Sequence, residues 1–184
     1  MSGRQESAGR RGGSFDAFDL ALRRARVAGT ADAGTLPRVV DRLAPDGGAA
    51  NVAWQITGVA DPLDRPALEI SLNGAVTLEC QRCLQSFVWP VAQRTVVLLA
   101  RDERELAALD DEAEEHEVVL AAQPLVAAEL IEDELLLTLP FAPHCGRAAC
   151  AASPLCADAA VDGRGSAFAA LAGLKTDDAK KPRD

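Results

Sequence analysis

The central part of the chain alternates apolar and polar side chains with a period of two residues, the pattern of half-buried β-strands. Residues 52–57 and 68–80 each carry one apolar face, and the second face is long. The alternation resumes over residues 87–91, and a further apolar run follows at residues 95–100. Proline donates no backbone hydrogen bond, so Pro90 indicates the edge of a sheet. Together these runs predict an antiparallel β meander.

Other stretches change to the helical period, in which apolar residues recur three and four positions apart. Residues 125–139 begin just after Pro124, a residue favoured at the first turn of a helix, and we expect this helix to pack on the sheet. Residues 168–174 predict a short amphipathic helix that caps the domain, and residues 15–22 a short helix that ends before Gly29. The predicted fold class is α+β: an antiparallel meander or partly closed barrel with one packed helix and a C-terminal helical cap.

Changes in composition divide the chain into three parts. Residues 1–34 are rich in arginine and glycine, and we expect a flexible N-terminal segment that contains the short helix. Residues 35–160 hold the predicted strands and the packed helix, and form the main domain. Residues 161–184 comprise a glycine-rich linker, a short helix and a charged tail. Inside the main domain, the acidic residues 101–117 predict a solvated loop or an exposed helix.

The protein has a formal net charge of −9, from 28 acidic and 19 basic residues. Proteins that grip nucleic-acid backbones gain affinity by releasing counterions to lysine and arginine, so an acidic body argues against non-specific nucleic-acid binding. It suits a basic partner such as a ribosomal protein, and we expect RNA contact only through the arginine-rich N-terminal end. The ~20 continuous apolar residues of a membrane span and the apolar core of a secretory signal are both missing. We therefore expect a cytoplasmic protein that contacts no membrane.

The cysteines are the strongest chemical signal. Two thiolates separated by two residues can turn around one zinc ion, and Cys80 and Cys83 have that spacing. The full set of candidate zinc ligands is Cys80, Cys83, Cys145 and Cys150, with Cys156 or His144 as alternates. The later cysteines are irregularly spaced, which favours the alternative of a reduced, metal-free pair that serves packing, so no cofactor is assigned. Disulfides are not expected, because cytosolic thiols are kept reduced.

Enzymatic groups are not evident in the sequence. His116 lies in the acidic run, and His144 adjoins Cys145, where neighbours rarely face each other as base and nucleophile. The carboxylates occur in runs rather than as a pair in apolar surroundings, so general acid–base catalysis has no candidate. Glycine-rich phosphate-binding motifs are also missing. We expect no catalytic residue and no small-molecule substrate. Arg82, between the two cysteines, is either a surface charge or a contact for phosphate or carboxylate.

Four segments in order resemble the YceD-type large ribosomal RNA subunit accumulation proteins of bacteria. They are residues 38–43, 76–84, 126–140 and 167–175, and the resemblance covers roughly residues 35–175. The piece from Cys80 to Leu84, followed by the piece from Glu134 to Pro140, is fairly specific in that order.

The resemblance implies a factor for synthesis, processing or stability of the large-subunit (23S) ribosomal RNA, and no catalytic activity is associated with the family's motif. We expect it to act by binding, with ribosomal RNA or a basic ribosomal or assembly protein as its partner. Binding would involve Arg82 together with Cys80 and Cys83. Two alternatives remain open: a zinc-ribbon-like RNA-binding module and, less favoured, a thiol redox protein. Redox activity of the thioredoxin type is disfavoured because its motif opens a helix, whereas this cysteine pair lies within a meander.

Overall fold

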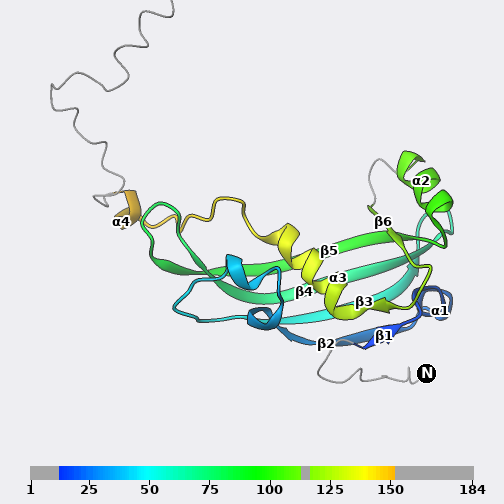
Figure 1. The fold of residues 1–184 in the computed structure, drawn as a ribbon, viewed down its shortest axis with the longest axis horizontal. Helices are drawn as coiled ribbons and strands as arrows, with labels where there is room; N and C mark the ends of the chain where they lie inside the picture. Colours follow the sequence, from blue (N-terminus) through cyan, green and yellow to red (C-terminus); the bar gives the residue numbers. More distant parts are fainter. Residues whose placement is uncertain (1–12, 113–116, 152–184) are drawn as a thin grey trace, which may run out of the picture. The chain divides into compact units, whose positions relative to one another are not determined.

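A computed structural model describes residues 13–112 and 117–151 of the chain. The chain forms two compact units, residues 1–145 and residues 146–184. Figure 1 shows the first unit as a long twisted sheet with helices beside it. In the second unit the described secondary structure is the short helix α4, Ala148–Ala151. The expected capping helix at residues 168–174 lies outside the described residues.

The first unit is built on a five-stranded sheet in the order β2-β3-β4-β5-β6. Its strands are β2 (Arg26–Asp32), β3 (Asn51–Ala60), β4 (Pro66–Glu79), β5 (Ser86–Ala100) and β6 (Glu117–Leu120). The predicted α+β class and the antiparallel meander are confirmed, because β2 to β5 pair with their sequence neighbours in antiparallel fashion. The partly closed barrel is not confirmed, because the sheet is open. At its end β6 pairs in parallel with β5, and the connection between them contains α2.

Smaller elements surround the sheet. They are β1 (Ser14–Phe15), α1 (Ala17–Arg23), the 3-10 turns Ala33–Thr35 and Val40–Arg42, α2 (Glu103–Glu112), β7 (Leu125–Val126) and α3 (Ala127–Thr138). The acidic run is thus largely an exposed helix, α2. The helix expected at residues 125–139 is confirmed as α3. Among the described residues, no helix has the length and apolar character that crossing a bilayer requires.

The N-terminal part was expected to be flexible up to residue 34, and here the prediction was wrong for residues 14–32. These residues form β1, α1 and β2, and β2 is an edge strand of the main sheet. The sequence concealed this strand because its side chains are mostly small and Gly29 looks like a helix breaker. In the fold Gly29 instead makes room for a ring, since a Cβ atom there would lie 2.8 Å from Cζ2 of Trp54.

Helices cover one face of the sheet. Gly58 of β3 lies against the backbone of α1, while Thr95 of β5 contacts Glu134 of α3. The strand register places Gly58 and Thr95 on the same face. The opposite face is exposed along the paired residues Ala53, Asn73 and Ala92. An antiparallel sheet tolerates one hydrated face, and the apolar side chains of the meander accordingly gather on the helix side.

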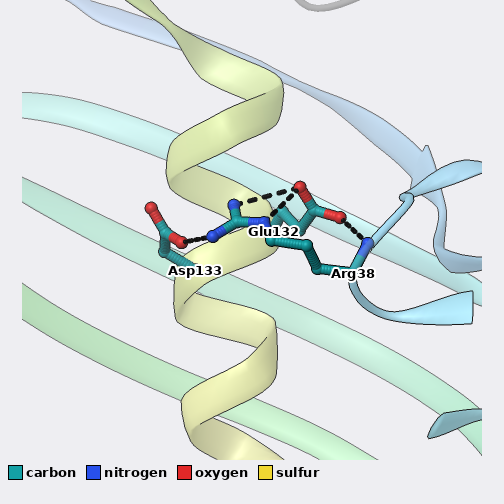
Figure 2. A network of polar contacts seen from close by, with 3 residues as sticks. All are labelled: Arg38, Glu132 and Asp133. Atoms are coloured by element: carbon teal, nitrogen blue, oxygen red, sulfur yellow. Dashed lines mark hydrogen bonds and ion pairs between the residues drawn. The ribbon is translucent and has the colours of Figure 1, made fainter. Parts of the chain in front are cut away.

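A buried carboxylate fastens the loop before β3 to α3 (Figure 2). Glu132 is 6% exposed and accepts a hydrogen bond from the backbone N–H of Arg38 at 2.6 Å. The Arg38 guanidinium also donates to Glu132, at 3.0 Å, and to Asp133. Burial alone would raise the pKa of Glu132, but the hydrogen bonds and charge of Arg38 outweigh it and lower the pKa below its usual value.

A second buried carboxylate on the same helix has no such partner. Glu134 is 3% exposed and accepts a hydrogen bond from the hydroxyl of Thr95 at 2.7 Å. Burial raises the pKa of Glu134 above its usual value, the Thr95 bond opposes this shift, and the charges of Glu117 and Asp133 add to it. The two carboxylates, two positions apart on α3, are therefore shifted in opposite directions.

Replacing Glu132 and Glu134, each by its amide, should shift the melting temperature at neutral pH in opposite directions. Glu132 contributes stability above its unfolded-state pKa, and this is lost as pH falls through its folded-state pKa, so E132Q should lower the melting temperature at about pH 7. Glu134 favours the folded state only when protonated, and this stability is lost as pH rises through its raised pKa. E134Q should therefore raise the melting temperature at about pH 7, with little difference at acidic pH. Thermal unfolding across pH measures both effects.

The exposed Glu129 provides the matched control on the same helix, and E129Q should leave the melting temperature almost unchanged. Equal effects of E132Q and E134Q at neutral pH would contradict the opposite roles of the two buried carboxylates.

Gly58 allows close packing between α1 and the sheet. A Cβ atom at this position would overlap the backbone carbonyl oxygen of Leu20, which cannot move without shifting the helix. We expect G58A to lower the free energy of unfolding by about 1–3 kcal/mol, the usual cost of overpacking. Denaturant unfolding measures this loss, and G13A is the control because no atom lies within 4 Å of its added Cβ. Equal stability of the two variants would show that α1 does not need this contact.

Candidate functional site

A tight turn between β4 and β5 carries the first two cysteines. The backbone N–H of Cys80 donates to the carbonyl of Gln85 at 3.0 Å, and the N–H of Leu84 donates to the carbonyl of Cys80 at 2.8 Å. Leu84 adopts the left-handed conformation, with φ of 57°, which is uncommon for a residue with a branched side chain. This backbone brings Cys80 and Cys83 together at the end of the long hairpin.

The segment after α3 reaches the same turn. We call residues 139–145, which follow the C-terminal end of α3, the strap. The carbonyl of Pro143 accepts a hydrogen bond from the backbone N–H of Gln81 at 2.8 Å. Two residues later, the N–H of Cys145 points at the sulfur of Cys80, with an N···S distance of 3.4 Å. The strap therefore delivers a third cysteine to a turn that is more than fifty residues away in the sequence.

The three sulfur atoms have the spacing of metal ligands. Those of Cys80, Cys83 and Cys145 lie within 4.8 Å of one another, and the Cys83–Cys145 pair is 3.8 Å apart. A disulfide bond would require about 2.05 Å. A tetrahedral zinc ion with Zn–S bonds of about 2.3 Å places its sulfur ligands about 3.8 Å apart. The arrangement thus matches three corners of a zinc–thiolate tetrahedron.

Backbone hydrogen bonds favour the thiolate at Cys80. Its side chain is fully buried, and burial by itself favours the neutral thiol. The N–H groups of Cys145, Cys83 and Arg82, together with the Cys83 thiol, donate hydrogen bonds to this sulfur. These bonds outweigh burial and lower the pKa of Cys80 to about 6. Because the thiolate is the metal-binding form, the turn provides a sulfur ligand suited to neutral pH.

The other candidate residues identified in the sequence lie outside this group of three thiols. Cys150 lies on α4 in the second compact unit, five positions after Cys145. Cys156 and His116 lie outside the described residues. His144 is exposed and does not belong to the described group of clustered thiols. Arg82 is exposed at the tip of the turn, as either of its two predicted roles requires.

Sequence reasoning missed two parts of this site. The hydrogen bond between Gln81 and Pro143 joins two backbone groups, so no side-chain pattern reveals it. The exposure of Phe141 on the strap was also missed. This ring is 89% exposed, and the signal was an aromatic residue placed between two prolines, where no regular strand or helix could bury it.

The segment that contains this site matches a protein-family model. Residues 68–175 match the family described as large ribosomal RNA subunit accumulation protein YceD. The match includes most of β4, the cysteine turn, α3 and the strap, and it spans more than half of the chain. No curated protein and no solved structure shows a significant match. The resemblance inferred from the sequence is confirmed, and the chain belongs to the YceD family of large ribosomal RNA subunit accumulation proteins.

Proposed function

We propose that this protein is a cytoplasmic, non-enzymatic factor that supports accumulation of the large-subunit (23S) ribosomal RNA by binding. The observation that carries this proposal is the family match over residues 68–175, which contains both the cysteine turn and the strap. Its partner is ribosomal RNA or a basic ribosomal or assembly protein. The exposed acidic helix α2 supports the protein alternative, since it presents carboxylates to a basic surface.

A zinc ion at the cysteine turn belongs to this proposal. Cys80, Cys83 and Cys145 supply three thiolates, and Cys150 is the first choice for the fourth ligand because few residues separate it from Cys145. Cys156 and His144 are the alternates. A zinc ion with four protein ligands leaves no position for substrate, so its role is structural. The spacing of the three sulfur atoms supports a second candidate function, that of a zinc-ribbon-like RNA-binding module.

A thiol redox function has less support. Redox cysteine pairs of the thioredoxin type lie at the N-terminus of a helix, whose backbone dipoles activate the first thiol. Cys80 and Cys83 instead lie between two antiparallel strands, β4 and β5. The low pKa of Cys80 comes from hydrogen bonds donated by Cys145 of the strap and by Cys83 and Arg82 of the turn, which are equally suited to a metal ligand.

Metal analysis tests the zinc centre. Protein purified from zinc-replete cells should contain about one zinc ion per chain, and C80S or C83S should remove it, because a structural site needs all four ligands. Native mass spectrometry measures the occupancy. The variants C150S, C156S and H144A identify the fourth ligand, since only one of them should lose the metal. If the wild-type protein contains no zinc, the zinc centre is refuted, and the cysteines serve packing in their reduced, metal-free form.

Deletion of the gene tests the biological role. The strain should contain less 23S ribosomal RNA relative to 16S and fewer large subunits in a sucrose gradient. The wild-type gene should restore both. A normal 23S level and a normal subunit profile in the deletion strain would refute the proposed function, whatever the metal content of the protein.

A further inference from the structure

The strap and the cysteine turn form one continuous surface element. They are joined by the hydrogen bond from Gln81 to Pro143, by the N–H of Cys145 at the sulfur of Cys80, and by the contact between the Cys83 and Cys145 thiols. All of these atoms belong to the first compact unit. The backbones of the turn and the strap are therefore held together, and a metal ion bound by the three thiols would fix them further.

Phe141 is the notable side chain on this element. At 89% exposed it is the most solvent-accessible large apolar side chain in the described part of the chain. The other described aromatic residues are buried or partly buried. Leaving a phenyl ring in water forgoes the stabilisation that burial of its apolar surface would give. The strap that carries the ring is held at Pro143, which is buried and accepts the hydrogen bond from the turn.

Arg82 lies at the tip of the same turn and is also exposed. An exposed aromatic ring near an arginine is the combination that binds unpaired RNA: the ring stacks on a base, and the guanidinium contacts a phosphate. Leu84, 56% exposed, adds an apolar side chain beside them on the turn. A purely apolar protein-docking patch would not require the charge of Arg82.

The acidic charge of the protein does not prevent RNA binding at this place. Strand β4 has 14 residues, so the cysteine turn lies about 40 Å from the opposite end of the sheet. The acidic helix α2 lies at that opposite end, following the last residue of β5 (Figure 1). Exposed charges are screened within about 8 Å at physiological salt. Glu79 adjoins the turn in sequence, and Asp46 accepts a hydrogen bond from Ser86 at the start of β5.

We infer that the cysteine turn and the strap form a contact surface for single-stranded RNA, with Phe141 stacking on a base and Arg82 binding phosphate. This inference rests on the proposed function and names RNA as the partner of the cysteine site. It places RNA contact at the turn rather than at the arginine-rich N-terminal end. Incompletely folded ribosomal RNA contains unpaired segments, whose bases are not yet enclosed by tertiary structure and can stack on an aromatic side chain.

The test measures binding of the full-length protein, as purified, to a short unstructured RNA by fluorescence anisotropy at several salt concentrations. F141A should weaken binding about tenfold, the effect of removing one base–aromatic stack. F141W should retain affinity, whereas F141L should be as weak as F141A because leucine cannot stack. R82A should weaken binding and lower the slope of log affinity against log salt by about one.

Two control variants lie at the other end of the sheet. L63A removes a side chain that is 73% exposed in the β3–β4 loop, and R104A removes an exposed arginine of α2. Both should bind RNA as the wild type does. Thermal unfolding of every variant shows whether an affinity change reflects the surface or a loss of fold.

Two results would overturn the inference: no measurable binding of RNA by the wild type, or wild-type affinity in both F141A and R82A. Full affinity in F141L would also overturn it, because an apolar contact without stacking is the signature of a protein partner. The proposed function fails separately, through normal 23S ribosomal RNA in the deletion strain. The zinc centre is tested separately by the metal analysis. The RNA surface, the role in 23S ribosomal RNA accumulation and the zinc centre can therefore each be refuted independently.

Discussion

The pairing of β4 with β5 is the constraint on which the rest of the molecule depends. The register runs without interruption from Ala67 opposite Leu98 to Glu79 opposite Ser86. Side chains alternate between the two faces of a strand, so a slip of one residue would turn the whole apolar face of the hairpin toward water. The register therefore fixes which face receives α1 and α3. The length of the two strands sets the distance between the acidic end of the sheet and the cysteine turn.

The helix side of the sheet shows how charge is accommodated in this packing. Glu132 is buried on α3, and a buried carboxylate without a cation is costly, so its bond to Arg38 ties the loop before β3 to one orientation of the helix. Glu134, two residues further on, has only the hydroxyl of Thr95 as its hydrogen-bond partner in the described structure. The first carboxylate adds stability at neutral pH and the second subtracts from it, although both occupy the same helix.

The cysteine site is built mainly by the backbone. Three N–H groups converge on the sulfur of Cys80, and the left-handed conformation at Leu84 closes the turn that directs them. The strap adds Cys145 through the bond between Gln81 and Pro143 and through the N–H of Cys145 at the sulfur of Cys80. A site held in this way keeps its thiols in place while leaving the tip of the turn and the ring of Phe141 open to a partner.

The sequence by itself determined the meander, the packed helix α3 and the family, because each of these is written in local periodicity or in a short ordered motif. It also identified Cys80 and Cys83, whose spacing is a local property. Only the tertiary structure decided that residues 26–32 add a strand to the sheet and that the sheet stays open. It likewise decided that Cys145 joins the turn. Gly29 fits against Trp54, β6 pairs in parallel, and Pro143 bonds to Gln81. These features depend on contacts between residues far apart in the chain, and many of them involve backbone atoms, which are the same in every residue and leave no trace in the sequence.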